Sequence, residues 1–419
     1  MSGDTGSDST AGGAGTDHAV AHLLERRVRE TAADIDAWLV EKRRSIRPAL
    51  YGSFDVRDAG WKVATVDANA FPAGFNNPPA ADRARLGALL ARYLASQHPE
   101  AKRLLLLPEA NTRNIGYAEN VRILASLLAS DGREVLIGAP RLNGVERLVG
   151  IEASSPLVEV DLGDGVAKAN GEAVDLVILN DDLTVGALPE LETPVLPSPR
   201  LGWYNRRKSD HFAALQPLLD ELAEILGLDP WLLCTHWFVS LDKCLDRDTC
   251  RRELAAEVDQ CLSVIGEKYV EHGIDAEPSM FIKSDRGTYG LGILRINNGS
   301  ELLDLSKRRM NRLTYGKGGS DVDDFLLQES VPTALRNGAA VLEPCGYAAA
   351  GETIAWFMRA NMKRGEVDNL NTPSTTFIHT DDLDAAASLQ VGRRAPLHRL
   401  LADVAALAVA CEQVETAEP

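Results

Sequence analysis

The chain has 419 residues, of which 45% are hydrophobic, 25% charged and 5% aromatic, a composition that excludes a disordered or fibrous protein. At roughly 100–200 residues per domain, this length predicts two or three domains. Acidic residues number 61 against 44 basic ones, for a formal charge of −17, which argues against duplex nucleic acid or an anionic membrane as the main partner. No apolar run approaches the roughly 18 residues of a membrane helix, and no signal peptide is recognisable. We therefore expect a cytoplasmic protein with small-molecule partners, for which a homo-oligomer remains one option.

The first half of the chain alternates between helical and strand patterns. Residues 1–17 contain 14 Gly, Ser, Thr or Asp residues and are expected to be a disordered tail. Apolar periodicity predicts helices over 18–44 and 116–130, and short apolar runs predict strands over 62–66, 103–107, 134–137, 157–162 and 174–179. This alternation predicts an α/β domain with a mostly parallel sheet. A proline-rich stretch near residue 197 marks the expected boundary between an N-terminal domain, 18–200, and a second domain, 201–419.

The second half combines longer helices with strands joined by turns. Helices are expected over 210–226, 248–272, 301–313 and 396–414. Strands are expected over 280–284, 290–296, 324–331, 339–347 and 353–361.

The most informative segment surrounds Lys283. This lysine ends an apolar strand, and a loop with Gly287, Gly290 and Gly292 follows before a second apolar strand. Glycines allow backbone N–H groups to approach a phosphate closely, and the lysine adds a point charge. The order strand–loop–strand fits neither a Walker loop nor a Rossmann fingerprint, both of which open a helix. The alternative is a glycine-rich hairpin with a surface lysine.

Downstream segments strengthen the phosphate-binding interpretation. The apolar strand that ends at Gln328 and Glu329 could present backbone groups to an adenine edge. Asn369 and Asn371 are two residues apart, so on an extended chain both amide side chains point to one side. Amide oxygens there could bind Mg²⁺, a hard ion that prefers oxygen ligands. Asparagines before a proline are also common in turns, and that alternative stays open.

This order of features resembles the ATP-grasp enzymes. The stretch from Lys283 to Ile293 is similar to the phosphate-covering loop of glutathione synthetase. The triplet 369–371 resembles the Glu-x-Asn metal ligands of that superfamily, with asparagine in place of the glutamate. The resemblance implies an ATP-grasp fold preceded by a Rossmann-like N-terminal α/β domain, with ATP and Mg²⁺ as cofactors.

A closer resemblance is to the glutamate–cysteine ligases of the proteobacterial ATP-grasp type. It rests on ordered blocks at Asp55–Lys62 with Val66–Asn77, Leu107–Asn114 with Tyr117, Gly202–Phe212, the Lys283 loop, and Gln328 to Asn371. Some positions depart from the family pattern, among them Asn111, Ser284, Arg286, Cys345 and Ser374. The ATP machinery is therefore expected to be retained, while the acceptor pocket could have changed.

The resemblance implies an ATP-dependent ligase that joins the γ-carboxylate of L-glutamate to the amine of L-cysteine through an acyl phosphate. We expect Lys283 and Arg359 to be catalytic. ATP is expected to contact Lys283, Gly287, Thr288, Gly290, Gly292, Gln328 and Glu329. Metal ligands are expected at Glu343, Asn369 and Asn371. Substrate is expected at Arg57, Asp67, Asn69, Asn76, Glu109, Arg113 and Asn114.

Chemistry of the side chains supports part of this assignment. Arg57 or Arg113 could fork onto a substrate carboxylate, and Asp67 or Glu109 could pair with its ammonium group. The alternative reading makes Asp67 and Arg113 structural loop caps. Two other functions stay open, the same ligase chemistry with a different amine acceptor, and a nucleotide-binding protein without chemistry.

Overall fold

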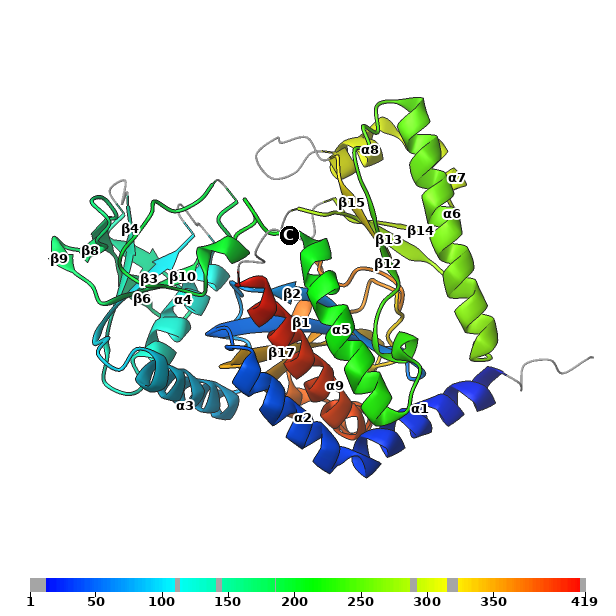
Figure 1. The fold of residues 1–419 in the computed structure, drawn as a ribbon, viewed down its shortest axis with the longest axis horizontal. Helices are drawn as coiled ribbons and strands as arrows, with labels where there is room; N and C mark the ends of the chain where they lie inside the picture. Colours follow the sequence, from blue (N-terminus) through cyan, green and yellow to red (C-terminus); the bar gives the residue numbers. More distant parts are fainter. Residues whose placement is uncertain are drawn as a thin grey trace, which may run out of the picture.

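The structure is a computed structural model that describes residues 13–109, 114–140, 145–184, 186–286, 292–314 and 323–414. It has a mixed α/β architecture with three larger sheets and helices packed against them (Figure 1). The predicted α/β class is confirmed. Among the described residues, no helix combines the length and the apolar character that crossing a membrane requires.

The central sheet has six strands and runs in the order β19-β18-β17-β1-β2, with β16 paired to β17. All its neighbours are antiparallel. Its strands are β1 (Tyr51–Asp58), β2 (Val63–Asn69), β16 (Arg336–Asn337), β17 (Ala340–Ala349), β18 (Glu352–Asn361) and β19 (Thr376–His379).

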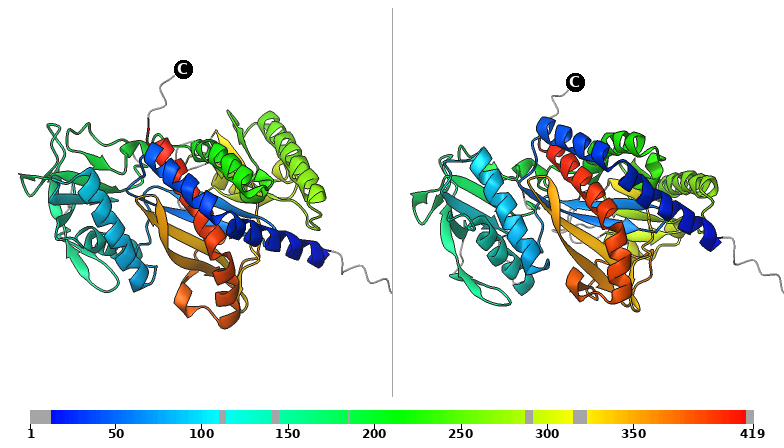
Figure 2. Two further views of the ribbon diagram at one scale, coloured as in Figure 1. Left: turned by 60° about the horizontal axis from the view of Figure 1, so that its bottom comes forward. Right: turned by 90° about the horizontal axis from the view of Figure 1, so that it is seen from below.

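One face of this sheet is covered by the long C-terminal helix α9 (Ala385–Glu412), which contacts β1, β2, β17 and β18. Helices α1 (Gly13–Glu30), α2 (Ala32–Ser45) and α5 (Lys208–Leu226) pack in turn around α9 (Figure 2). Helices near the two ends of the chain therefore meet over the same sheet, and residues Leu401–Ala410 of α9 are buried throughout.

A second sheet has seven strands in the order β11-β10-β3-β4-β7-β8-β9. The pairs from β11 to β7 are parallel, as expected from the strand–helix alternation, and the last two pairs are antiparallel. Helices α3 (Ala80–Gln97) and α4 (Ile115–Leu128) accompany it, and α3 also contacts β17 and β18. The strands are β3 (Arg103–Pro108), β4 (Glu134–Ala139), β7 (Val158–Asp161), β8 (Lys168–Ala169), β9 (Glu172–Ala173), β10 (Leu176–Asn180) and β11 (Val195–Leu196), beside a hairpin of β5 (Arg147–Val149) and β6 (Ser154–Pro156).

The third sheet is antiparallel and runs in the order β12-β15-β13-β14. Its strands are β12 (Trp237–Ser240), β13 (Met280–Ser284), β14 (Leu294–Ile296) and β15 (Phe325–Glu329). Helix α6 (Asp248–Glu271) packs on β12 and β15, and α7 (Ser300–Leu303) and α8 (Lys307–Thr314) complete this part. Single 3-10 turns lie at Pro199–Leu201, Pro230–Leu233 and Thr380–Asp382.

Several predicted boundaries were wrong for local physical reasons. The helix expected over 18–44 is interrupted at Thr31, whose hydroxyl donates to the carbonyl of Arg27 at 2.9 Å, a contact that bends helices. The helix expected over 301–313 is two helices, and the strand expected over 290–296 begins at Leu294 within the described residues. Helix α9 begins at Ala385, eleven residues before Pro396, because Asp384 caps it and the helix accommodates the proline.

Strand β1 was not predicted at all. All eight of its residues are buried, yet Asp55, Arg57 and Asp58 make it look like a polar loop in the sequence. Pairing with β17 places β1 and β2 in a sheet with residues from the far side of the expected boundary at residue 200. The division into 18–200 and 201–419 stays a prediction, and a sheet crosses it.

Candidate active site

A cavity of about 250 Å³ lies where the central sheet meets β13 and β15. Side chains from β1, β2, β13, β15, β17 and β18 line it, together with the segment that leads into α5. It brings together ten of the residues expected at a site: Arg57, Asp67, Asn69, Lys283, Gln328, Glu329, Glu343, Arg359, Asn369 and Asn371. Residues from four expected roles therefore share one space.

Other expected site residues lie elsewhere. The lining does not include Asn76, Glu109, Asn114 or Gly292. Asn114 caps α4, because its side-chain oxygen accepts from the backbone N–H of Gly116 at 2.9 Å. Gly292 has a φ of 70°, a conformation that favours glycine. The expected residues Gly287, Thr288, Gly290 and Arg113 lie outside the described part of the chain.

The floor of the cavity carries four buried charges in an alternating chain, which we call the cavity cluster: Arg57, Glu343, Arg359 and Asp55. Arg57 and Arg359 each form an ion pair with Glu343, and Arg359 forms a second with Asp55 at 2.8 Å. Register explains the proximity, because Glu343 of β17 faces Arg359 of β18 and Asp55 of β1 faces Cys345 of β17. With all four groups ionised, the two positive and two negative charges of this cluster balance.

Burial and neighbours act differently on the two carboxyl groups of this cluster. Burial would raise the pKa of Glu343, but the guanidinium groups of Arg57 and Arg359 hold it below the ordinary value. The pKa of Asp55 is raised, because burial outweighs the attraction of Arg359 and Glu343 adds repulsion. Two carboxyl groups with pKa values pushed apart are typical of functional sites.

Arg57 is already engaged on all sides. Besides Glu343, its guanidinium donates to the backbone carbonyls of Glu366 at 3.0 Å and Asp368 at 2.8 Å. These contacts tie the segment that carries Asn369 to β1. The expected role of Arg57 as a carboxylate ligand stays a prediction, and such a contact would have to replace one of these bonds.

Three ionisable groups form the opposite wall. The Lys208 ammonium lies 3.1 Å from Asp67, and the Lys283 ammonium donates to the carbonyl of Val66 at 3.3 Å. Burial lowers the pKa of Lys283 to about 8. Despite burial, Lys208 and Lys283 together hold the pKa of Asp67 well below its usual range. This wall therefore offers two cations and one carboxylate to a ligand.

Gln328 and Glu329 lie at the end of β15, as predicted. The Gln328 amide donates to the carbonyl of Val66 at 3.3 Å and to the Thr235 hydroxyl at 3.1 Å. Among the described residues, no donor reaches its side-chain oxygen, which is buried. The Glu329 carboxylate accepts from the buried Lys62 ammonium at 2.6 Å and from the His236 backbone at 2.9 Å.

Lys208, Trp203, Asp55 and Cys345 also line the cavity but were not expected there. Lys208 lies 4.7 Å from the centre of the Trp203 ring, a cation–π contact. The signal for both was the block at 202–212, which carried the family resemblance without a role for each residue. Nothing in the local sequence indicated that Asp55 and Cys345 face each other.

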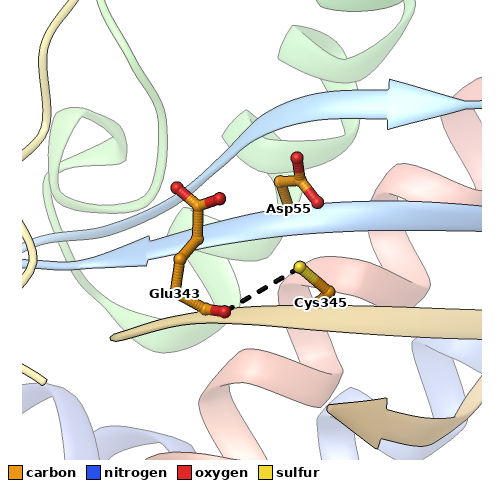
Figure 3. A group of neighbouring side chains, drawn as sticks. All are labelled: Asp55, Glu343 and Cys345. Carbon is orange, nitrogen blue, oxygen red and sulfur yellow. Dashed lines mark hydrogen bonds between the residues drawn. The ribbon is translucent and has the colours of Figure 1, made fainter. Parts of the chain in front are cut away.

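Carboxylate and amide oxygens line the cavity, and these are the ligand types that a hard cation such as Mg²⁺ prefers. Asp55, Glu343 and Cys345 hold their potential ligand atoms within 4.8 Å of one another (Figure 3). A thiol is a poor ligand for Mg²⁺, and the two arginines already occupy Glu343, so this trio does not fit Mg²⁺ unchanged. Asn369 and Asn371 fit better, although the Asn369 oxygen now accepts from the Asn371 backbone at 2.9 Å in a local turn.

Similarity to known proteins indicates the family of this chain. A family model described as glutamate-cysteine ligase matches residues 25–413. A solved structure from Methylobacillus flagellatus KT, proposed to be a gamma-glutamylcysteine synthetase, is similar with a TM-score of 0.84 and 30% identity, over 93% of this chain and 95% of that one. A comparison with curated proteins finds no match.

Two further solved structures are much more distant. One is the D-alanyl-alanine synthetase A of Vibrio cholerae, with a TM-score of 0.33 and 11% identity over 71% of this chain and 81% of that one. The other is a glutathione synthetase-like effector of Globodera pallida, with a TM-score of 0.36 and 12% identity over 83% of this chain and 84% of that one. On the family match and the first structure, the chain belongs to the glutamate–cysteine ligase family and is an ATP-dependent ligase.

Proposed function

We propose that this ligase joins L-glutamate to L-cysteine, forming γ-glutamylcysteine, ADP and phosphate. The observation that carries the proposal is the single cavity that holds Lys283, the strand end at Gln328 and Glu329, and the pair of Asp67 and Lys208. Those groups supply cations for a polyphosphate and an ion pair for an amino acid. The proposal includes the ATP-grasp fold with a Rossmann-like N-terminal domain, the two-domain division and a cytoplasmic location.

The chemistry needs ATP because a carboxylate is a poor electrophile. In the first step a γ-carboxylate oxygen of glutamate attacks the terminal phosphorus of ATP and ADP leaves. In the second step the amine attacks the acyl carbon, loses a proton, and phosphate leaves with the former carboxylate oxygen. Lys283 would neutralise charge that shifts during phosphoryl transfer, and Arg359 would orient the reacting groups. No nucleophilic side chain is required.

Magnesium is the metal we propose. Glu343, Asn369 and Asn371 would hold it with the ATP phosphates, and replacing one arginine contact of Glu343 is part of that binding. The ion would screen charge on the transferring phosphoryl group.

Amino-acid recognition falls to Asp67 and Lys208. These two groups lie 3.1 Å apart and carry opposite charges, as do the ammonium and α-carboxylate of an amino acid. The Asp67 carboxylate can therefore bind the substrate ammonium, and the Lys208 ammonium can bind the α-carboxylate. Asn69 lies beside them in the lining. This assignment gives Lys208 the carboxylate-binding role expected for Arg57 or Arg113.

One observation favours a second candidate, the same chemistry with a different amine. Cys345, a departure from the family pattern, lies in the cavity opposite Asp55, where it could alter the acceptor subsite. Arg286 also departs, and Asn111 lies outside the described residues.

The test is purified protein with ATP and Mg²⁺, assayed for ADP release as L-glutamate and L-cysteine are omitted in turn. We expect release to need both, with γ-glutamylcysteine as the product by mass spectrometry. A panel of amines is then offered in place of cysteine. Glutamate-dependent ADP release with a clear preference for another amine would establish the second candidate and reject cysteine.

A further inference from the structure

Residues 203–207 and the first residue of α5, Lys208, form the wall of the cavity that carries Trp203 and Lys208. This wall is irregular backbone up to Lys208 and belongs to no sheet ladder, so individual contacts hold it, such as the Trp203 N–H that donates to the carbonyl of Asp182 at 2.9 Å. On one side, the Lys208 N–H donates to the carbonyl of Asp285 at 2.8 Å. The other side rests on Arg206, which does not line the cavity.

Arg206 is buried and binds two distant parts of the chain. Its guanidinium donates to the carbonyl of Ala68 at 2.8 Å. Ala68 lies in β2 between Asp67 and Asn69, both of which line the cavity. The same guanidinium lies 5.3 Å from the centre of the Trp203 ring, on which Lys208 also rests. One side chain therefore fixes the spacing between the Lys208 wall and the Asp67 strand.

Glu412, at the C-terminal end of α9, holds Arg206 in place. Its carboxylate accepts from Arg206 at 2.5 and 3.1 Å and lies 2.7 Å from the ring nitrogen Nδ1 of His211. Only 3% of the Arg206 side chain and 4% of the Glu412 side chain are exposed, so neither ion is solvated on its own. A carboxylate removed here would leave a buried guanidinium unpaired, which folded proteins tolerate poorly.

From these contacts we propose that Glu412 and Arg206 form a clamp by which the C-terminal helix positions Lys208 against Asp67 for amino-acid binding. The proposal rests on the proposed role of Lys208. Glu412 is a positioning residue, since its hydrogen bonds in the described part of the chain go to Arg206 and His211, neither of which lines the cavity. Helices α5 and α9 run side by side in both views, so the clamp joins the last turn of α9 to the first turn of α5 (Figures 1 and 2).

The test compares Glu412→Gln with Asp403→Asn. Asp403 is a matched control because it lies on the same helix and its side chain is similarly buried. It forms an ion pair with Arg43 at 2.8 Å, and neither residue lines the cavity. Both changes turn a buried carboxylate into an amide. We expect both to lower the melting temperature, but only Glu412→Gln to raise the KM for L-glutamate, by about tenfold. The KM for ATP should stay within about twofold.

Lys208→Met supplies the second arm. If Glu412 acts through Lys208, the KM for L-glutamate of the Glu412→Gln/Lys208→Met double variant should rise by less than the product of the two single increases. The shortfall should be about threefold or more. The clamp would be overturned if Glu412→Gln and Asp403→Asn lowered the melting temperature equally and Glu412→Gln left the glutamate KM unchanged. It would also be overturned if the two single increases in glutamate KM simply multiplied in the double variant. If Glu412→Gln folds poorly, Arg206→Lys, which keeps the charge but loses the fork, is measured in the same way.

Wild-type protein in the same assay separates the two claims. If its ADP release does not respond to L-glutamate, the proposed substrate is wrong. If it responds but the variants behave as just described for an overturned clamp, the proposed function stands and the clamp is rejected.

Discussion

Strand β1 carries two buried ionic clusters that differ in what covers them. The cavity cluster takes Asp55 and Arg57 from this strand and opens onto the cavity. The other, which we call the sealed cluster, consists of Asp58, Arg394 and His398 and lies beneath α9. Arg57 and Asp58 are adjacent in the strand, yet we expect them to have different roles.

In the sealed cluster every oxygen of the Asp58 carboxylate is satisfied. Arg394 donates to both oxygens at 2.9 and 3.0 Å, and His398 lies 2.6 Å from one of them. The His398 and Arg394 contacts outweigh burial and hold the pKa of Asp58 well below its usual range. The cavity cluster instead leaves the Nε of Arg359 without a partner among the described residues. Complete pairing indicates a structural role, whereas an unused buried donor beside a cavity indicates ligand binding.

The largest effect is expected from breaking the sealed cluster. Asp58→Asn leaves Arg394 with only the longer ion pair to Glu25, at 3.7 Å, so the free energy of unfolding should fall by about 3 kcal/mol. Turnover per folded molecule should stay within about twofold, because Asp58 does not line the cavity. Denaturant unfolding and an activity assay on the folded fraction measure the two quantities. A large loss of turnover with little loss of stability would show that the sealed cluster is functional and would contradict its proposed structural role.

Acid should act on the same cluster. Because the folded-state pKa of Asp58 is lowered, its contribution to stability is complete above the unfolded value of about 3.9 and is lost as the pH falls below it. The acid-induced fall in unfolding free energy should therefore be shallower in Asp58→Asn than in the wild type. Equal slopes would show that Asp58 titrates alike in both states.

The next largest effect is expected on the cavity side. Lys283→Ala should lower turnover by on the order of 10²–10³-fold, as for the loss of one preorganised charge-stabilising group. Stability should change little, because within the described ranges Lys283 makes one hydrogen bond, to the Val66 carbonyl, and burial already disfavours its charge. Lys283→Arg should not fully restore turnover, since a planar fork is not a compact point charge. Normal turnover in a destabilised Lys283→Ala protein would make this lysine structural.

A smaller effect is expected at the proposed metal site. Glu343→Gln should raise the Mg²⁺ concentration needed for half-maximal activity by about 10–100-fold. The measurement is a Mg²⁺ titration of initial rates at saturating ATP. An unchanged Mg²⁺ requirement with lower turnover would confine Glu343 to holding Arg57 and Arg359.

The smallest effect is expected from pH. The empty-site pKa of Lys283 is about 8, and its protonated form favours the phosphates. ATP should therefore bind best below pH 8 and about tenfold more weakly at pH 9 than at pH 7. Calorimetric titration with ATP and Mg²⁺ measures this, and Lys283→Ala should remove most of the slope. A wild-type affinity independent of pH would place Lys283 away from the phosphates.

Local patterns explain why some of this was predictable. The strand at Met280–Ser284 and its terminal Lys283 follow from an apolar run and the glycine loop after it, and the structure has the strand at those residues. Strand β1 was missed because its charges are neutralised by Glu343, Arg359 and Arg394, which lie hundreds of positions later. No local pattern can show such a pairing. For the same reason, the contact of Arg206 with Glu412, which lies 206 positions later, could not be predicted from the sequence.

The central claim is that a carboxylate is activated by phosphorylation, and isotope transfer tests it most directly. L-Glutamate labelled with ¹⁸O in its γ-carboxylate is turned over with ATP, Mg²⁺ and L-cysteine, and the released phosphate is analysed by mass spectrometry. The account predicts one ¹⁸O atom in each phosphate, because the acyl phosphate gives up its bridging oxygen. Phosphate without label, alongside formation of the γ-glutamyl product, would contradict it.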